Sequence, residues 1–387
     1  MQTLIPPPYS GDQFGYYTVG DKFKTYSKLE AIEEMARTGI HLEWHFNKPY
    51  YESFDWKKEP AESLDELYRR RAQEIRDRYD YIVLWYSGGP DSWCMLKAFL
   101  DNNIHIDEIA HYTSLEGDGD TRSVMNEEIF FNAMPQVEKI IAERPGIKQR
   151  EVDVSEIMKQ VYLRGDIKFD YIYNIKGIVS ANSFSRSFIR EYVDDYQKIM
   201  DSGKKMCFLW GAEKPRLLNR QGKYHVSFID VFSETNLRLQ SLADRGYYDE
   251  WFYWAPTSAA MVAKQCHILM KILKTETADS AWLEDQQHGA HNPKSITTGK
   301  YLRNDIYHTA IYPGWDPGTL VSPKPINKLI GERDTWFWKQ SHDVKTSPWY
   351  ASHGIFELIK RVGPYWMNDV NDITKGIKGC VNLYALE

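Results

Sequence analysis

The most constraining stretch of this chain runs from residue 81 to residue 100 and reads YIVLWYSGGPDSWCMLKAFL. Its first six residues are apolar, with charged residues before them and a glycine pair after them, which is the pattern of a buried strand in a parallel sheet. Gly88 and Gly89 then let the backbone turn sharply, and Pro90 suits the first turn of a helix. The apolar residues that follow recur at helical spacing. The stretch therefore predicts a strand, a tight turn and a helix.

A turn of this kind predicts an anion site, because it points backbone N–H groups and the positive end of a helix dipole at one place. Asp91 and Ser92 are favourable residues near a helix N-terminus. The Gly-Lys-Ser/Thr ending of a Walker loop is absent from the turn. The alternative is a structural strand-to-helix turn that binds no ligand.

Residues 87–92, Ser-Gly-Gly-Pro-Asp-Ser, match an SGGxDS signature. Here the chain resembles the PP-loop ATP pyrophosphatases, the adenine nucleotide α-hydrolase-like superfamily. The resemblance implies a doubly wound, Rossmann-like parallel α/β sheet over residues 79–275 and Mg-ATP bound with its phosphates over residues 87–92. It also implies that an acceptor oxygen attacks the α-phosphorus and releases pyrophosphate, after which a nitrogen or sulfur nucleophile displaces AMP.

The resemblance also implies roles for individual residues. Asp91 would order the loop or hold the metal, and the hydroxyls of Ser87 and Ser92 would bond phosphate oxygens. A second strand is expected over residues 107–112, and in this family its end contacts the adenine or ribose. The implied nucleotide-binding residues are Tyr86, Ser87, Gly88, Gly89, Asp91, Ser92, Tyr112, Thr113 and Gly211.

The loop after this second expected strand is acidic. Glu116, Asp118 and Asp120 lie within a run of glycine, serine and threonine, and carboxylates are ligands that Mg²⁺ accepts beside phosphates. Asp91 and Asp118 are therefore the predicted magnesium ligands. A solvated acidic loop without metal is the alternative.

A second informative stretch covers residues 206–216 and reads MCFLWGAEKPR. Its first five residues predict an apolar strand, and Gly211 opens a loop that carries Lys214 and Arg216. Cleavage between the α- and β-phosphates builds negative charge on the leaving pyrophosphate, which such cations can neutralise, and arginine can bind phosphate oxygens in a bidentate manner. Lys214 and Arg216 are the predicted catalytic cations together with Asp91. The alternative is a surface loop whose charges are solvated.

Composition excludes some classes of protein. A net charge of −6 argues against a protein that coats nucleic acid, so nucleic acid is expected only as a substrate. No apolar run reaches the length of a membrane span, and the N-terminus does not read as a signal peptide. A cytoplasmic protein without a membrane partner is the expectation.

The four cysteines, Cys94, Cys207, Cys266 and Cys380, form no CxxC pair, which argues against a zinc or iron–sulfur site. Cys380 lies near the C-terminus, where PAPS reductases carry a reactive cysteine, but its Gly-Cys-Val-Asn setting differs from theirs. An inert, packed thiol is the favoured interpretation.

The rest of the chain is expected to flank the central domain. Residues 1–78 read as an extended arm followed by a helical lead, in which Ser63 and Glu66 form a capping box. The arginines at positions 69–71 read as a solvated face. The aromatic block at 247–256 reads as packing, and residues 276–387 form a family-specific C-terminal region.

Three functions remain open on the sequence. The favoured one is an AMP-forming ligase or transferase that adenylates an unidentified acceptor, with a separate partner that donates ammonia or sulfur. Residues 1–93 contain no cysteine, so no N-terminal glutaminase nucleophile is expected within this chain. The alternatives are a PAPS reductase-like oxidoreductase that binds a sulfonucleotide, and a nucleotide-binding module without catalysis.

Overall fold

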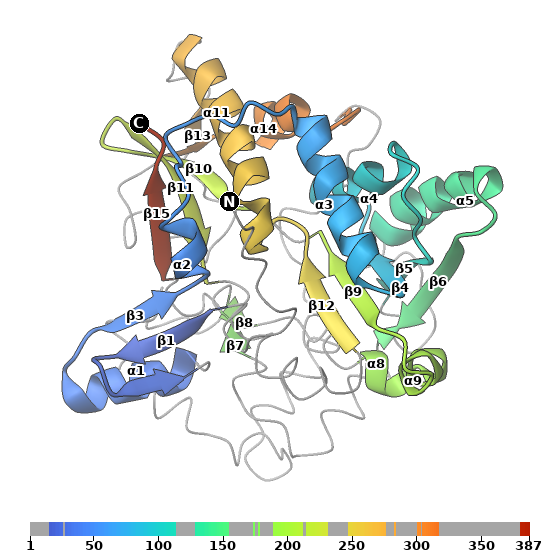
Figure 1. The fold of residues 1–387 in the computed structure, drawn as a ribbon, viewed down its shortest axis with the longest axis horizontal. Coiled ribbons are helices and arrows are strands. Elements are labelled where there is room, and N and C mark those ends of the chain that lie inside the picture. Colours follow the sequence, from blue (N-terminus) through green and yellow to red (C-terminus); the bar gives the residue numbers. More distant parts are fainter. Residues whose placement is uncertain are drawn as a thin grey trace.

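The computed structural model describes residues 15–25, 28–113, 128–154, 173–174, 177–178, 189–211, 214–230, 247–275, 282–283, 300–302, 304–316 and 380–387. Within them the chain forms a parallel sheet, a larger antiparallel sheet and a small N-terminal sheet (Figure 1). In Figure 1 the parallel sheet lies on the right and the larger antiparallel sheet on the upper left, with helix α11 (Ala259–Thr275) between them.

The parallel sheet has five strands in the order β12-β9-β4-β5-β6. β4 is central. The next two strands of this sheet along the chain, β5 and β6, lie on one side of it, and the later strands β9 and β12 lie on the other. This is the doubly wound, Rossmann-like order, which reverses direction between β4 and β9. The parallel α/β sheet predicted from the sequence is confirmed. The strands are β4 (Tyr81–Trp85), β5 (Glu108–Thr113), β6 (Lys148–Asp153), β9 (Met206–Trp210) and β12 (Tyr247–Trp251).

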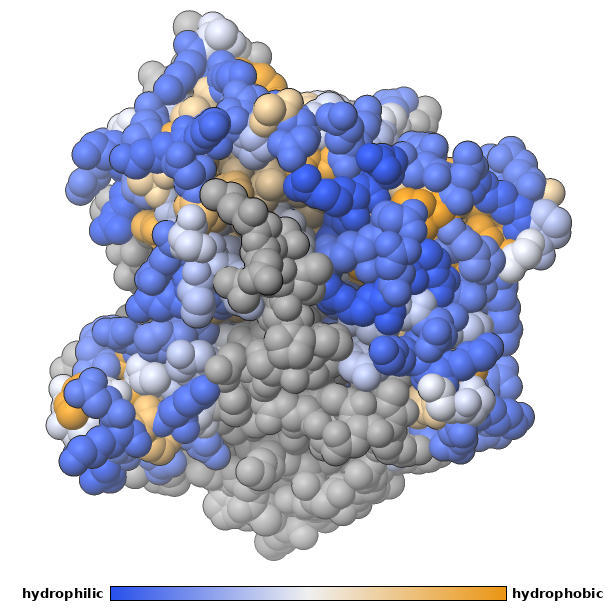
Figure 2. Space-filling view, in the orientation of Figure 1, coloured by the Kyte–Doolittle hydropathy of each residue, from blue (hydrophilic) through white to orange (hydrophobic). Residues whose placement is uncertain are grey.

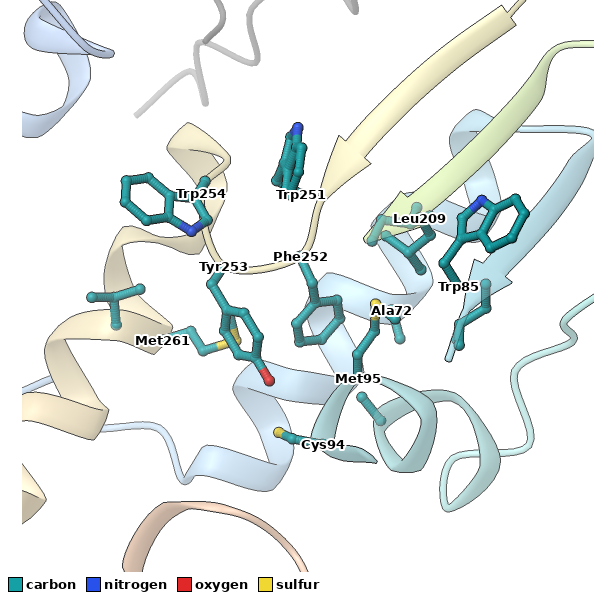
Figure 3. Close-up of a cluster of buried hydrophobic side chains, with 14 of the residues drawn as sticks. Ala72, Trp85, Cys94, Met95, Leu209, Trp251, Phe252, Tyr253, Trp254 and Met261 are labelled. Carbon is teal, nitrogen blue, oxygen red and sulfur yellow. The ribbon is translucent and has the colours of Figure 1, made fainter. Parts of the chain in front are cut away.

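Helices cover both faces of this sheet. Helix α4 (Pro90–Leu100) packs against α3 (Leu64–Arg78), which also contacts α11 (Ala259–Thr275). Leu209 of β9 points into this layer beside Met95 and Phe252 (Figure 3). The preceding residue, Phe208, points to the other face, because side chains alternate along a strand. There its ring lies 5.0 Å from that of Tyr196 in α9 (Asp194–Asp201).

Helix α3 begins at the predicted capping box. The Ser63 hydroxyl accepts a hydrogen bond from the backbone N–H of Glu66, and the Glu66 carboxylate accepts one from the backbone N–H of Ser63 at 2.8 Å. The two bonds satisfy N–H groups that a helix start leaves without acceptors. The prediction of a capping box is confirmed.

The arginine run in α3 is not a uniformly solvated face, so that prediction is wrong for one of its members. Arg69 and Arg70 are exposed, but Arg71 is buried. Its Nη2 atom lies 2.8 Å from Oε2 of the equally buried Glu250 in β12. Arg71 lies one helical turn from Leu67 and Ile75, both core residues, so the apolar face of α3 carries it inward with the core residues.

The larger antiparallel sheet combines strands from distant parts of the chain. Its order is β13-β14-β10-β11-β15, and β10 and β11 form a hairpin directly after the second predicted phosphate stretch. β15 pairs with β11, so residues beyond 276 share a sheet with residues 216–229. The predicted domain boundaries themselves stay predictions. The strands are β10 (Arg216–Arg220), β11 (Lys223–Ile229), β13 (Trp282–Leu283), β14 (Lys300–Leu302) and β15 (Val381–Ala385).

The N-terminal region is a three-stranded antiparallel sheet packed on a helix. The start of this region was expected to form an extended arm, but β1 and β2 pair as a hairpin, which turns at Gly20 with a φ of +60°. α1 ends at Thr38, followed by Gly39 with a φ of +72°, as expected of a helix C-cap. The elements are β1 (Tyr16–Val19), β2 (Phe23–Thr25), α1 (Lys28–Thr38), β3 (Leu42–His45) and α2 (Lys48–Tyr51).

On the face shown in Figure 2, the surface of the described residues is mainly hydrophilic, with small hydrophobic patches. None of the helices in the described residues is long and apolar enough to span a bilayer.

Candidate functional site

The carboxyl ends of β4 and β9 lie side by side at the point where the strand order reverses. Trp85 and Trp210 are the last residues of these strands and face each other in register. Their rings stack with centroids 5.2 Å apart and an interplanar angle of 7°. Ligands of doubly wound sheets bind beyond the carboxyl ends of the strands at such a switch point. Both stretches that the sequence singled out continue from these two strand ends.

The turn after β4 is a tight loop held together by its own serines. Gly88 has a φ of +82°, which glycine adopts without strain, and Gly89 precedes the first turn of α4. The hydroxyl of Ser92 donates to the carbonyl of Gly89 at 3.0 Å and accepts from the backbone N–H of Ser87 at 3.3 Å. The hydroxyls of Ser87 and Ser92 lie 3.1 Å apart. Their predicted bonds to phosphate oxygens stay predictions.

Gly211, the residue after β9, touches the start of α4. A Cβ atom at position 211 would lie 2.8 Å from the Cα atom of Ser92 and 3.1 Å from the carbonyl oxygen of Asp91. Both of these are backbone atoms, so neither can rotate away. Glycine at position 211 therefore lets the end of β9 lie directly on the first turn of α4.

Lys214 lies against that same first turn. Its Nζ atom donates to Oδ1 of Asp91 at 3.0 Å, and the two side chains are 4% and 22% exposed. Two of the three predicted catalytic residues are thus in contact. Arg216, the third, is the first residue of β10 and pairs in register with Ser227. β10 begins at Arg216, so this residue belongs to a sheet rather than to the predicted loop.

Two tyrosines that the sequence did not indicate also reach Asp91. Tyr312, just after α14 (Asn304–Ile311), donates its hydroxyl to Oδ1 of Asp91. The hydroxyl of Tyr253 donates to the backbone carbonyl of Asp91 at 2.8 Å. Burial raises the pKa of both phenols well above the usual value, so both are protonated donors at neutral pH.

No sequence signal could have identified Tyr312, because 221 residues separate it from Asp91. Tyr253 lies in the aromatic block that was interpreted as packing. That interpretation holds for its buried ring (Figure 3) but not for its hydroxyl.

The other predicted nucleotide-binding residues surround the turn. Tyr86 extends β4 and is buried. At the end of β5, the ring of Tyr112 lies 6.0 Å from that of Trp85, and the hydroxyl of Thr113 donates to Glu151 at 2.8 Å. The structure therefore gathers Tyr86, Tyr112, Gly211 and the loop at the same edge of the sheet. Their contacts with adenine or ribose stay predictions.

The predicted magnesium site falls mainly outside the described residues, which include neither Glu116, Asp118 nor Asp120. Among the residues that are described, no three His, Cys, Asp or Glu side chains are grouped so that they could hold a metal ion. Asp91 bonds to Lys214 and Tyr312 through one of its carboxylate oxygens. Its role as a metal ligand stays a prediction.

Three of the four cysteines are poor candidates for redox chemistry. Cys94, Cys207 and Cys266 are buried, and burial raises the pKa of Cys94 and Cys266 to about 12. Such thiols are protonated at neutral pH and therefore weak nucleophiles. Cys380 is half-buried and precedes β15, and its backbone N–H donates to Asp230 at 2.7 Å. It thus belongs to the larger antiparallel sheet, not to the parallel sheet.

Comparison of the chain with models of known protein families gives no match, and comparison with curated proteins gives none either.

Proposed function

We propose that this chain is a PP-loop enzyme that binds ATP and cleaves it to AMP and pyrophosphate in order to adenylate an acceptor. One observation carries the proposal. A glycine turn of the SGGxDS type, which follows β4, and a buried lysine, which follows β9, meet at the switch point of a doubly wound sheet. In this class of fold the switch point is where nucleotides bind.

The phosphates would lie over the turn and the start of α4. The first N–H groups of any helix lack intrahelical acceptors and carry the positive end of its dipole. Lys214 adds a full positive charge beside them. Because the carboxylate of Asp91 holds the lysine in place, Asp91 acts in this proposal by positioning Lys214. Phosphate oxygens would compete with that carboxylate for the ammonium group.

In the proposed reaction an acceptor oxygen attacks the α-phosphorus, and the bond from the α-phosphorus to the oxygen that bridges to the β-phosphorus breaks. The electron pair of that bond leaves on pyrophosphate. Lys214 would stabilise the charge that develops there, and such stabilisation is stronger in a buried site than in water. Arg216 is proposed to assist. A nitrogen or sulfur nucleophile then displaces AMP from the adenylated acceptor.

Magnesium is expected to arrive bound to the ATP phosphates. No part of the proposed reaction depends on a particular protein ligand to the metal.

The proposal is tested by incubating the protein with Mg-ATP labelled at the α- and γ-phosphates, together with candidate acceptors, and separating the products. Asp91→Asn is the informative variant, because the carboxamide has the shape of the carboxylate but cannot hold Lys214 by charge. Asp101→Asn is its matched control. Asp101 pairs with Lys97 at the opposite, exposed end of the same helix.

AMP and pyrophosphate from the wild type and from Asp101→Asn, but not from Asp91→Asn, would support the proposal. ADP and phosphate would overturn cleavage at the α-phosphorus. ATP binding without turnover would favour the nucleotide-binding module. Binding of PAPS in place of ATP would favour the sulfonucleotide enzyme, for which Cys380 would be the thiol to test.

A further inference from the structure

The glycine loop is also contacted from the side of β5 and the helix that follows it. A wide helical turn, η1 (Ile129–Ala133), leads into α5 (Met134–Glu143). From this turn, Nδ2 of Asn132 donates to the carbonyl oxygen of Gly88 at 3.1 Å. Oδ1 of Asn132 accepts from Nε2 of Gln136 at 2.7 Å, which fixes the orientation of the Asn132 amide.

The wide turn has a cause in the sequence. The N–H of Met134 bonds to the carbonyl of Ile129, five residues back, as in a π-helix. The next residue, Pro135, has no N–H and cannot follow a regular helical turn without a clash. Single π-turns occur often at functional sites.

The turn and the loop are in close contact. A Cβ atom at Gly88 would lie 3.2 Å from the Cβ atom of Ala133 and 3.2 Å from Nδ2 of Asn132. Glycine at position 88 thus has two roles: it adopts the positive φ of the loop, and it lets the loop lie close to the wide turn.

A second carbonyl of the loop is held in the same way. Nδ1 of His111 in β5 donates to the carbonyl of Tyr86 at 2.7 Å. The loop therefore has two carbonyls, at Tyr86 and Gly88, that bond outward to side chains of neighbouring elements.

The C=O and the N–H of one trans peptide point in opposite directions. The Tyr86 carbonyl and the Ser87 N–H belong to one peptide. Because the carbonyl bonds to His111, the N–H faces the other way, toward the Ser92 hydroxyl at 3.3 Å. In the same way, because the Gly88 carbonyl bonds to Asn132, the N–H of Gly89 faces the Ser87 hydroxyl at 3.3 Å. Both N–H groups thus lie on the inner side of the turn.

We propose that Asn132 is a positioning residue, which works with His111 to keep the loop carbonyls outward and the loop N–H groups inward, toward a bound phosphate. Without the amide of Asn132, the Gly88–Gly89 peptide could rotate and present a carbonyl oxygen to the phosphate. Carbonyl oxygens repel anions, so phosphate affinity would fall although Asn132 never touches the ligand. The proposal rests on the proposed function for the identity of the anion.

The sequence permits a direct observation of this peptide. Residues 88 and 89 are the only adjacent glycines in the chain. In protein labelled with carbonyl-¹³C glycine and ¹⁵N glycine, a carbonyl-to-amide correlation spectrum contains one signal, the Gly89 N–H. Its position and its hydrogen-exchange rate report the orientation of the peptide without any ligand.

The informative variants are Asn132→Asp and Asn132→Ala. Asp keeps the size of the side chain and an acceptor for Gln136, but an ionised carboxylate cannot donate to Gly88. The matched control is Asn102→Ala, because Asn102 donates to a carbonyl of Ala98 at 2.9 Å at the far end of α4. We expect the Gly89 signal to shift and its exchange to accelerate about tenfold in both Asn132 variants, as on loss of one ordinary hydrogen bond. The Asn102 variant should leave it unchanged.

A second measurement uses ligands. Asn132→Ala should weaken ATP binding about tenfold, comparable to the loss of one hydrogen bond, and leave adenosine binding unchanged, because adenosine carries no phosphate. The alanine variant is used here because the charge of an aspartate would itself repel ATP. A thermal unfolding curve close to that of the wild type shows that the variants are folded.

A Gly89 signal that stays in place in both folded variants would overturn the proposal, whether or not ATP binds. Equal losses of ATP and adenosine affinity would also overturn it. A wild-type protein that binds no ATP would overturn the proposed function, while the Gly89 signal would still decide whether Asn132 orients the loop.

Discussion

Nζ of Lys214 lies 3.0 Å from Oδ1 of Asp91, although 123 residues separate the two in the chain. The lysine follows β9 and the aspartate lies in the first turn of α4. The exposed pair of Lys97 and Asp101 lies at the other end of the same helix. One helix therefore carries a buried and an exposed ion pair, and each is a control for the other.

Lys214→Ala should lower the free energy of unfolding by about 3 kcal/mol, because loss of one partner leaves a poorly solvated charge at Asp91. It should also weaken ATP binding at least tenfold. Lys97→Ala should change the free energy of unfolding by less than about 1 kcal/mol, since solvent screens exposed pairs. Urea denaturation and calorimetric titration measure the two quantities. Equal effects of the two substitutions would show that burial of the Lys214 pair is unimportant.

Gly211→Ala should destabilise the protein by about 1–3 kcal/mol, the range for overpacking a tight contact. The new methyl group meets the backbone of Asp91 and Ser92, so β9 and α4 must separate. The control is Gly146→Ala, because a Cβ atom at position 146 has no neighbour within 4 Å. Chemical denaturation of both variants tests this. If Gly211→Ala left the free energy of unfolding unchanged, the end of β9 and the start of α4 could separate without loss of stability.

Burial lowers the pKa of His111 to about 4, whereas an exposed imidazole titrates near 6.5. Below pH 6.5 the unfolded chain binds a proton at this residue and the folded chain does not, until the pH approaches 4. The contribution of His111 should therefore make the protein less stable as the pH falls through this interval, by about 3 kcal/mol in total.

The measurement for His111 is the difference in unfolding free energy between the wild type and His111→Asn across this pH range. Asparagine keeps a donor for the Tyr86 carbonyl but does not titrate, so the variant should lose this part of the pH dependence. His105→Asn replaces an exposed imidazole and is the control. A constant difference between the wild type and His111→Asn would contradict the expectation.

Arg71→Ala should destabilise the fold by about 3–5 kcal/mol, because it leaves Glu250 fully buried with fewer cationic partners. Arg70→Ala, one residue away and exposed, should cost less than about 1 kcal/mol. Thermal unfolding distinguishes the two. Arg78 and the hydroxyl of Tyr79 also lie 2.7 Å and 2.6 Å from Oε1 of Glu250. Similar melting temperatures for both variants would show that these two groups alone satisfy the carboxylate.

The central fold could be predicted because its signals are local. The apolar run of β4, the glycine pair and the capping box at Ser63 are each contained within a few neighbouring residues. Local patterns also located the second strand end at Gly211, and with it Lys214.

The parts that were missed depend on contacts between distant segments. Tyr312 reaches Asp91 only because the segment after α14 lies on α4, where Trp93 donates to the carbonyl of Pro313 at 3.1 Å. Helical spacing places Arg71 on the same face of α3 as Leu67 and Ile75, but its partner Glu250 lies 179 residues away and leaves no local signal. The helical spacing of apolar residues shows which side chains face inward, but it does not identify the residue that pairs with a buried charge.

The pairing of β15 with β11 also affects how the chain must fold. Cys380 and Asp230, at the start of this pairing, are bonded across 150 residues. During synthesis the hairpin of β10 and β11 therefore emerges long before its last neighbour. Until β15 arrives, one side of β11 presents unpaired backbone groups, and such edges promote association between incomplete chains. A high contact order of this kind slows folding. Folding of this sheet can be completed only after the last strand has been made.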